Sequence, residues 1–342
     1  MCDVEEYIAN YLATSWDDSV CNTNLRRRST ECREQLWGGI QPLGQNAAEL
    51  KREQEQEQTG NCRVEDCGGK MEDSGRNRKF KIAVVGDFMQ DRYWIGESTS
   101  LSAEVPIPIV KIKEVKGYAG GAGNVAMNLL ALGCDTVSIS GGGTPVKNRL
   151  MVGDHQLARW DENDKCSSAS GFNRMVGIDA IVVADYGKGS VDETCIAAVK
   201  RHQDVPIFVD TKRDPSVWSG VATAIFPNDK EWNQFGVQYN EFVGVVVHKL
   251  GAAGLSMKNQ TLWSPATARF IRSVNGAGDT VMAAFVYKYL ESQQVDWDIS
   301  WEDILDFANT AAAIAVEHPY TYAPAISEVT ERYKGLLVYE HS

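Results

Sequence analysis

Short apolar segments alternate with helical patterns from residue 80 onward, and this alternation restricts the possible folds more than any other feature of the chain. Each segment has the length of a strand and is apolar almost throughout, which is typical of strands buried on both faces of a parallel sheet. The segments lie at residues 81–87, 136–140, 180–185, 206–210, 224–228 and 243–250. Helical patterns lie at residues 122–132, 192–202 and 301–315. The sequence therefore predicts an α/β fold with a doubly wound, mostly parallel sheet flanked by helices.

Several of the predicted strands end in an acid or an asparagine. Ligands of doubly wound sheets bind beyond the carboxyl ends of the strands, so polar side chains at these ends are candidates for a functional site. The side chains predicted to share this edge are Asp87, Asp185, Asp210 and Asn228.

Two stretches do not follow the alternation. Residues 105–113 alternate apolar and polar side chains after their prolines, and residues 146–152 and 155–161 have the pattern of a hairpin that turns at Gly153 and Asp154. Together they predict a small antiparallel sheet, a lid formed by residues 92–117 and 143–165. Apolar side chains on its outer face favour a partner subunit.

A glycine-rich turn precedes the apolar helical run at residues 281–290. Gly276 and Gly278 permit a tight backbone, so the amides of residues 276–279, including that of Ala277, are able to converge on an anion at a helix N-terminus. Asp279 follows at once, and a carboxylate beside bound phosphate is suited to accept a proton from an attacking hydroxyl. The alternative is that Asp279 caps the helix; the turn alone does not decide between them.

The composition restricts the partners of the chain. Its 342 residues carry a net charge of −12 with a pI near 5.0, which argues against a nucleic-acid-binding surface. No apolar run approaches the roughly 20 residues of a membrane span, and the N-terminus has no signal-peptide pattern, so we expect a cytosolic location. The cysteines are irregularly spaced, which favours reduced thiols.

Residues 1–79 differ from the rest of the chain. They are polar, with a Glu/Gln-rich run at residues 51–58, and they are expected to form an N-terminal extension that is partly disordered or helical. No chemistry is predicted there. The folded domain is expected at residues 80–342.

Three motifs, in order, make residues 80–324 resemble the ribokinase-like (PfkB) carbohydrate kinases. The run Asn-Gly-Ala-Gly-Asp-Thr ending at Thr280 is similar to the C-terminal signature of that family, and Gly-Gly-Ala-Gly-Asn ending at Asn124 is similar to its N-terminal signature. The run Asn-Asp-Lys-Glu ending at Glu231 resembles its Asn-x-x-Glu motif. Within the family, the strongest likeness is to kinase domains that act on D-glycero-D-manno-heptose 7-phosphate in lipopolysaccharide precursor synthesis.

The resemblance implies a role for each matching residue. Asp279 would be the catalytic base, with the amides of Gly276, Ala277 and Gly278 as the anion hole. The residues expected to bind the sugar or its phosphate are Asp87, Asp91, Gly120, Gly121, Asn124, Asp185, Lys188 and Lys212. For Lys212 a surface salt bridge is the alternative.

The cofactor expected from the resemblance is ATP with Mg²⁺. Asn228 and Glu231 would contact the metal, indirectly, and the phosphates. The nucleotide itself would be contacted by Lys249, Gly251, Gly254 and Asn309. A loop glycine pair and a helix-surface amide are the alternatives for the last three.

The chain also departs from the family pattern. Ser273 and Asn275 replace an acid and a threonine, so potassium activation is not expected. Residues 318–324 replace a glycine-rich nucleotide loop. A helix and a strand of the family are missing near residues 142–144, and another helix is missing near residues 235–243. The resemblance also implies a homodimer through the lid. We expect an ATP-dependent sugar kinase acting on a heptose 7-phosphate or a similar phosphosugar. The alternatives are a kinase for another sugar or a nucleoside, and a non-catalytic sugar- or nucleotide-binding scaffold.

Overall fold

A computed structural model describes residues 78–258, 262–294 and 299–340, with side chains described up to residue 334. Residues 1–77, which hold nearly all of the predicted extension, lie outside the described residues. No helix in the described ranges is long and apolar enough to cross a membrane. The cysteines in these ranges are free thiols, as expected: Cys134, Cys166 and Cys195.

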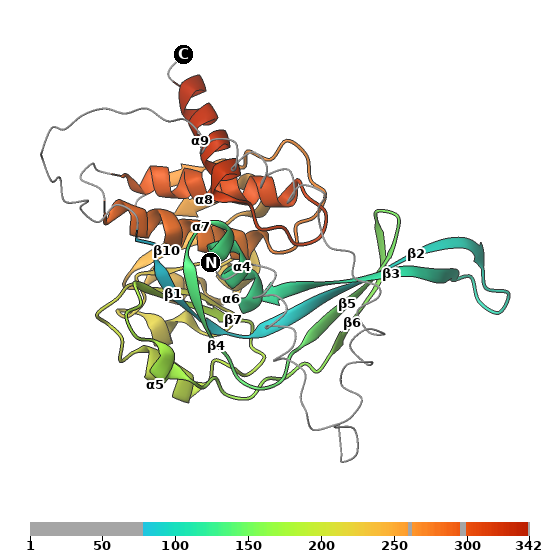
Figure 1. Cartoon of the computed structure of the whole chain (residues 1–342), viewed down its shortest axis with the longest axis horizontal. Helices are drawn as coiled ribbons and strands as arrows, with labels where there is room; N and C mark the ends of the chain where they lie inside the picture. The colour runs from blue at the N-terminus through green and yellow to red at the C-terminus, as the bar shows by residue number, and fades with distance from the viewer. Residues whose placement is uncertain (1–77, 259–261, 295–298, 341–342) are drawn as a thin grey trace, which may run out of the picture. The chain divides into compact units, whose positions relative to one another are not determined.

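The main sheet contains eight strands in the order β12-β11-β10-β9-β8-β7-β1-β4 (Figure 1). The six strands from β4 to β10 pair in parallel, and β11 and β12 add an antiparallel edge. The bounds are β1 (Lys81–Gly86), β4 (Asp135–Ile139), β7 (Ala180–Asp185), β8 (Ile207–Thr211), β9 (Ala224–Ile225), β10 (Val245–Lys249), β11 (Leu255–Met257) and β12 (Leu262–Ser264). The predicted doubly wound, mostly parallel sheet is confirmed.

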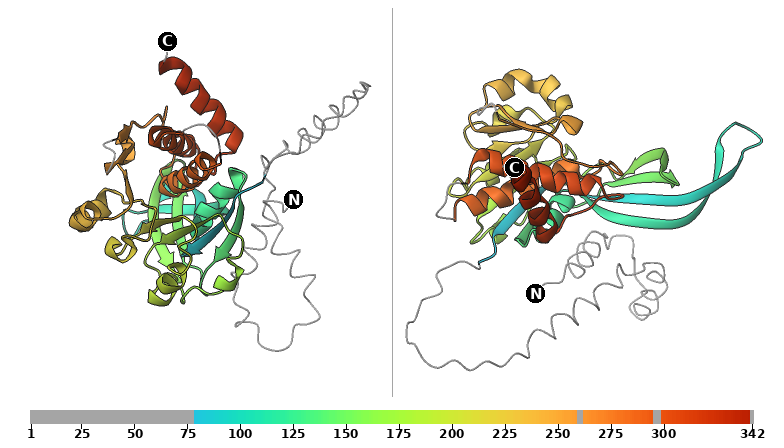
Figure 2. Two further views of the ribbon diagram at one scale, coloured as in Figure 1. Left: turned by 90° about the vertical axis from the view of Figure 1, so that its left-hand side faces the viewer. Right: turned by 90° about the horizontal axis from the view of Figure 1, so that it is seen from above.

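Helices cover both faces of this sheet. The bounds are α4 (Ala122–Ala131), α5 (Glu193–Val199), α6 (Asp229–Asn240), α7 (Ala277–Ser292), α8 (Trp301–Val316) and α9 (Ile326–Glu340), with short 3-10 turns η2 (Phe172–Arg174), η3 (Pro215–Trp218) and η4 (Gly251–Ala253). Side chains of α4, α7 and α8 pack against one face, and side chains of α5 and α6 pack against the other. The ribbon views show helices on both sides of the sheet (Figure 2). Within β1, Ile82 and Val84 face the first layer while Ala83 and Val85 face the second, because side chains alternate along a strand.

The strand predicted at residues 224–228 is shorter than expected, because its end turns into a helix cap. Only Ala224 and Ile225 form the strand β9, and Asn228 makes an isolated bridge to Lys249. The side chain of Asn228 then accepts a hydrogen bond from the amide of Glu231, and the carboxylate of Glu231 accepts one from the amide of Asn228. This reciprocal capping box fixes the start of α6 beside the end of β10.

A separate sheet of four strands, here called the lid sheet, has the order β3-β2-β5-β6. Its strands are β2 (Phe88–Leu101), β3 (Pro108–Gly121), β5 (Val146–Val152) and β6 (His155–Glu162). The predicted hairpin of β5 and β6 is confirmed, but β2 pairs with β5 in parallel, so the lid sheet is mixed. Both strands leave the main sheet at the same edge, after β1 and after β4, and so run outward in the same direction.

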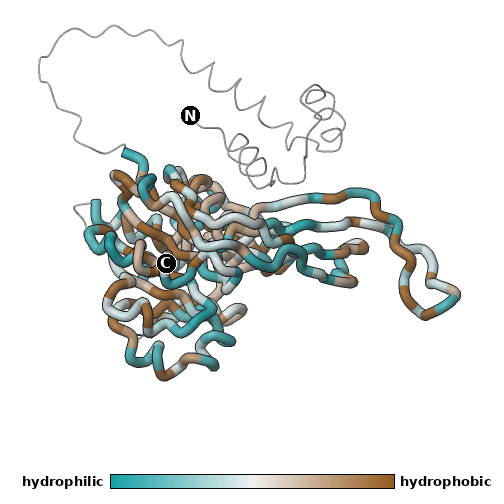
Figure 3. Tube along the Cα trace, turned by 90° about the horizontal axis from the view of Figure 1, so that it is seen from below, coloured by the Kyte–Doolittle hydropathy of each residue, from teal (hydrophilic) through white to brown (hydrophobic). Residues whose placement is uncertain are grey.

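The strands β2 and β3 extend as a ribbon beyond the rest of the lid sheet, with apolar residues along it (Figure 3). The exposed apolar side chains of this ribbon are Leu101, Val105, Ile107, Ile109, Ile112 and Val115. Residues 140–145 contain no helix or strand, as expected from the elements missing near residues 142–144. The expectation for residues 235–243 is met only in part, because α6 extends to Asn240 and only residues 241–244 lack a helix or strand.

Candidate active site

Asp279 lies in the first turn of α7, directly after the glycine turn. The helix is capped by Gly276, whose backbone is left-handed (φ 80°), and a Cβ on this residue would lie 2.4 Å from Nδ2 of Asn124. Only glycine fits such a position without strain. The first-turn amides of Gly278 and Asp279 have no intrahelical acceptor, which leaves them to an anion. The alternative that Asp279 caps the helix is wrong, since Gly276 occupies that position.

Both carboxylate oxygens of Asp279 accept hydrogen bonds. Nδ2 of Asn124 donates to Oδ2 over 2.8 Å, and the hydroxyl of Tyr186 donates to Oδ1. The side chain is 8% exposed, and this burial raises the pKa of Asp279 to about 6, although the two hydrogen bonds act to lower it. The carboxylate is therefore ionised at neutral pH but retains more proton affinity than an exposed aspartate, as a general base requires.

A buried ion-pair network adjoins the turn. Nζ of Lys249 lies 2.5 Å from Oδ2 of Asp210, and a Cβ on Gly278 would lie 3.5 Å from the same Nζ. The Lys249 ammonium therefore borders the amides that are open to an anion. Burial opposes the ionisation of Asp210, but its lysine neighbours outweigh burial and lower the pKa of the carboxyl.

Lys212 belongs to this network. Its ammonium lies 3.2 Å from Oδ1 of Asp210 and also pairs with Glu231. Burial acts to lower the pKa of Lys212, and the two carboxylates raise it overall. The structure shows the salt-bridge alternative for Lys212, although the pair is largely buried, and the contact with the substrate's phosphate remains a prediction.

The lid sheet contributes a second carboxylate. Asp91 is 6% exposed, and its Oδ1 lies 2.5 Å from Nη1 of Arg149. A Cβ on Gly120 would lie 2.5 Å from Oδ2 of Asp91, so the close packing of β3 requires a glycine there. Gly121 leads into α4 with a left-handed backbone (φ 56°) and so places Asn124 in reach of Asp279. The two glycines therefore act through the backbone.

Asp87 and Asp185 have roles that differ from the prediction. Asp87 is fully buried, and its carboxylate accepts the amides of Tyr186, Lys188 and Ser190 over 2.8 to 3.0 Å. Asp185 is 1% exposed and accepts from the amide of Gly187 and the hydroxyl of Thr211. Neither side chain is accessible to a ligand. Both carboxylates instead fix the loop of residues 186–190, and their predicted sugar contacts are corrected to positioning roles.

The residues predicted to contact the nucleotide make contacts within the protein itself. Asn309 is buried, and its Nδ2 donates to Oγ of Ser264 over 2.9 Å, so the amide is not on the helix surface. A Cβ on Gly254 would lie 2.1 Å from the carbonyl oxygen of Ser264, and Gly251 has a left-handed backbone. The two glycines shape the turn between β10 and β11, and Asn309 holds the end of β12; their contacts with a nucleotide remain predictions.

Glu231 and Asn228 are only partly suited to a metal. The carboxylate of Glu231 is taken up by the capping box and by Lys212. The described ranges contain no group of three or more His, Cys, Asp or Glu side chains that would hold a metal ion. A Mg²⁺ ion that enters with a nucleotide needs few protein ligands, because phosphates and water complete its coordination.

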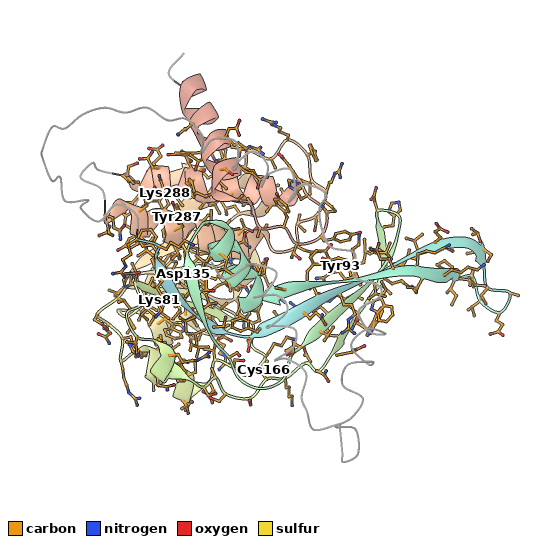
Figure 4. All side chains as sticks on the ribbon, viewed as in Figure 1. Lys81, Tyr93, Asp135, Cys166, Tyr287 and Lys288 are labelled. Carbon is orange, nitrogen blue, oxygen red and sulfur yellow. The ribbon has the colours of Figure 1, made fainter. Side chains whose placement is uncertain are left out.

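Aromatic side chains join the lid sheet to the residues around the turn. Nδ2 of Asn275 donates to the hydroxyl of Tyr93 over 3.0 Å, and Tyr93 lies where the lid ribbon leaves the main body (Figure 4). Tyr320, in the segment at residues 318–324, stacks on Tyr118 of β3. Asn275 therefore links the glycine turn to the lid.

Sequence reasoning missed several site residues. Tyr186, Lys147 and Arg149 were not assigned, and Asp210 was placed on the sheet edge without a role. Lys147 and Arg149 alternate along β5, and the parallel register pairs them with Asp91 and Tyr93 of β2. The alternation was visible in the sequence, but the strand that faces it was not.

Comparison with known proteins agrees with this geometry. Residues 173–328 match the family model described as pfkB family carbohydrate kinase. The structure of this chain is similar to that of Arabidopsis thaliana ribokinase complexed with ribose and ATP. The TM-score is 0.59 and the identity 18%, over 75% of this chain and 99% of that chain. For phosphofructokinase-2 from Escherichia coli the TM-score is 0.59 and the identity 14%, over 76% and 99%. The chain therefore has a ribokinase-like fold, with a region that matches the pfkB family of carbohydrate kinases.

Curated relatives narrow the comparison within this class. The chain is 28% identical over 311 residues to the bifunctional protein HldE of Pseudomonas syringae pv. tomato, covering 74% of this chain and 64% of that protein. It is 29% identical over 294 residues to the bifunctional protein HldE of Shewanella piezotolerans, covering 70% and 60%. The chain thus spans less than two thirds of the length of these relatives. The resemblance to the PfkB kinases that the motifs indicated is confirmed.

Proposed function

We propose that this chain is an ATP-dependent sugar kinase that transfers the γ-phosphoryl group to a sugar hydroxyl. The observation that carries the proposal is the placement of Asp279, a buried carboxylate beside open amides at the start of α7 and within hydrogen-bonding distance of Asn124. Phosphoryl transfer needs this combination, since it depends on positioning and on stabilisation of charge.

Each group has a definite part in the reaction. Asp279 accepts the proton of the attacking hydroxyl, and its pKa near 6 keeps it ionised at neutral pH. The amides of Gly278 and Asp279, and the ammonium of Lys249 beside them, receive the negative charge of the transferred group. Asn124 and Tyr186 hold the carboxylate in position. Glu231 and Asn228 would hold Mg²⁺ indirectly, and the ion would supply further charge neutralisation.

For the acceptor we propose a heptose 7-phosphate or a similar phosphosugar. The support is the resemblance of the sequence to heptose 7-phosphate kinase domains and its similarity to the bifunctional protein HldE. The anomeric hydroxyl would be the acceptor, giving a 1,7-bisphosphate. A reaction that consumes ATP favours a cytoplasmic location.

We further propose that the chain pairs with a second copy through the lid ribbon. Exposed Ile107, Ile109 and Ile112 give this ribbon an apolar surface of the kind that protein partners cover. The oligomeric state in solution, measured by light scattering for the chain and for Ile109→Asp, tests this part separately.

A coupled assay of ADP release across a panel of sugars and phosphosugars tests the kinase proposal. The expected result is sugar-dependent release that falls at least about a thousandfold in Asp279→Asn, because the general base and its charge are lost. Nucleotide binding, measured by calorimetry, should persist in that variant. Sugar or nucleotide binding without any ADP release would favour a non-catalytic scaffold. The hydrogen bonds that both carboxylate oxygens of Asp279 accept within the protein are also compatible with that alternative.

A further inference from the structure

Lys147 lies on the lid sheet, directly opposite Asp91 in the pairing of β5 with β2. Its ammonium makes no hydrogen bond or ion pair in the described part of the chain; its recorded contact is the ring of Tyr186, 5.3 Å from Nζ to the centroid. Burial lowers the pKa of Lys147, while the carboxylates of Asp91 and Asp279 act in the opposite direction. The ammonium therefore lies within the electrostatic reach of both site carboxylates without touching either.

The neighbouring cations differ from Lys147, because each of them has a carboxylate partner. These pairs are Arg149 with Asp91, Arg159 with Asp161, Lys188 with Asp164, Lys212 with Asp210 and Glu231, and Lys249 with Asp210. Among the described residues around the site, Lys147 is the cation that lacks such a partner.

An ammonium that is partly buried without a counter-ion costs free energy on folding. The cost is offset when a ligand brings the missing anion. Lys147 is suited to this, because it lies opposite Asp91 and within the electrostatic reach of the base Asp279, around the place where an acceptor would bind.

Two further cations of the lid side are able to join it. Lys188 pairs with Asp164, whose side chain is 58% exposed, and Arg159 is itself 46% exposed. Each pair has at least one well-exposed side chain, so the exchange of its carboxylate for a ligand anion costs less than it would for a buried pair. Asp161 lies directly opposite Lys147 in the pairing of β6 with β5, and its carboxylate also lies within the electrostatic reach of Lys188.

We propose that Lys147 binds an anionic group of the acceptor, so that the acceptor is a sugar carrying a phosphate or a carboxylate. This inference rests on the proposed function in one respect, because it takes the bound sugar to be the phosphoryl acceptor. The anion-binding site itself is argued from the geometry around Lys147. It transfers the role predicted for Lys212 to a residue with an unpaired charge. A phosphate is the better fit, since Lys188 and Arg159 offer further charge beside Lys147.

Calorimetric binding of matched ligands tests the proposal. The probes are sedoheptulose 7-phosphate, sedoheptulose and glucuronate, each titrated into the unmodified protein, Lys147→Gln and Lys147→Arg. We expect the phosphate to strengthen binding roughly tenfold to a hundredfold, as a hydrogen bond to a charged group does. Lys147→Gln should lose that gain and Lys147→Arg should keep part of it. A gain with glucuronate instead would assign the site to a carboxylate.

Lys113→Gln is the matched control, because this lysine lies on the same lid sheet and pairs with Glu97 at the exposed surface. Its ligand binding should equal that of the unmodified protein. If the phosphate gives no gain, or if Lys113→Gln loses the gain equally, the proposal is wrong. Thermal unfolding adds a second readout: the melting temperature of free Lys147→Gln should match or exceed that of the unmodified protein, whereas a large decrease would make Lys147 a structural residue.

Kinetics separate this inference from the proposed function. Phosphate-dependent binding that needs Lys147, with no ADP release from any sugar, would retain the subsite and overturn the kinase. Release with both phosphorylated and unphosphorylated sugars, with kcat lowered equally in Lys147→Gln, would retain the kinase and overturn the subsite. The expected result is a raised KM for the phosphorylated acceptor alone.

Discussion

The hydroxyl of Tyr186 donates a hydrogen bond to Oδ1 of Asp279, the carboxylate assigned as the base. The ammonium groups of Lys147 and Lys212 both contact the ring of Tyr186, each with its Nζ 5.3 Å from the ring centroid. The loop that carries this tyrosine is fixed by Asp87, so the bond connects a buried carboxylate at the end of β1 to the start of α7. Tyr186 therefore positions the base and sets its proton affinity.

Replacement of Tyr186 by phenylalanine should shift the pH dependence of activity. The hydrogen bond stabilises the ionised form of Asp279, so its loss raises the pKa of the carboxyl above the present value of about 6. The acid limb of kcat/KM should move upward by roughly one pH unit, with a smaller effect near about pH 8. The pH profile of ADP release measures this. Tyr289→Phe, a change elsewhere on α7, is the control; an unmoved limb in Tyr186→Phe would remove the tyrosine from the control of the base.

The buried carboxylate should also cost stability. Burial raises the pKa of Asp279 from 3.8 to about 6, so the folded state binds this proton more tightly than the unfolded state. The contribution is unfavourable above the folded pKa and disappears as the pH falls below 3.8. The full cost is roughly 3 kcal/mol. Asp279→Asn should therefore raise the melting temperature at about pH 7.5, and raise it less at about pH 5; a lower melting temperature at both pH values would contradict this account.

The two glycines of the turn should respond differently to alanine. Gly276 has a left-handed backbone, and a Cβ there would lie 2.4 Å from Asn124, so Gly276→Ala should lose at least about 2 kcal/mol of stability. A Cβ on Gly278 would lie at an ordinary contact distance of 3.5 Å from Lys249, so Gly278→Ala should fold. Its activity should nevertheless fall, since the methyl group narrows the approach to the amides. Urea unfolding and ADP release, measured on both variants, test this prediction. Equal stability of the two variants would mean that position 276 does not require a glycine.

Removal of one partner of the Asp91 and Arg149 pair should destabilise the protein. Both side chains are nearly buried, and a lone buried charge costs several kcal/mol. Arg149→Met should thus lower the free energy of unfolding by about 3 kcal/mol or more. The double variant Asp91→Leu with Arg149→Met should recover most of that loss, because neither charge is then left alone. Chemical unfolding of the single and double variants measures the difference; additive losses would mean that the pair contributes little.

The parts of this structure that sequence could predict are those fixed over short distances along the chain. The left-handed turn at Gly276 and the buried helix after it follow from the residues themselves, and so Asp279 was found. The strands of the main sheet were found because burial on both faces makes each one apolar throughout. The polar ends of these strands then indicated the edge that carries the site.

The remaining site residues depend on contacts between distant segments. Lys147 lies opposite Asp91 only because β5 pairs in parallel with β2. The residue pattern of one strand does not predict which strand pairs with it. Asp87 ends a strand at the edge that carries the site, and the resemblance to the PfkB kinases implied that it binds a sugar. Its carboxylate is instead enclosed by the loop of residues 186–190, which lies about a hundred residues further along the chain and donates its backbone amides to it. Neither the pairing nor the return of the loop has a local signal.

Tyr320 joins the lid to the main body at a cost in backbone energy. It has a left-handed backbone (φ 66°), which for a tyrosine costs about 1 to 3 kcal/mol. It stacks on Tyr118 with centroids 5.3 Å apart and packs edge-on against Tyr93 at 4.7 Å. Tyr320→Gly relieves the strain but removes both contacts, so the lid should loosen while the main sheet keeps its stability. We expect faster hydrogen exchange in the amides of β2 and β3 at residues 91–95 and 115–118, a higher KM for the acceptor, and a nearly unchanged melting temperature. Tyr320→Phe keeps the rings and should exchange as the unmodified protein does; equal exchange in the glycine variant would mean that the aromatic contacts do not hold the lid.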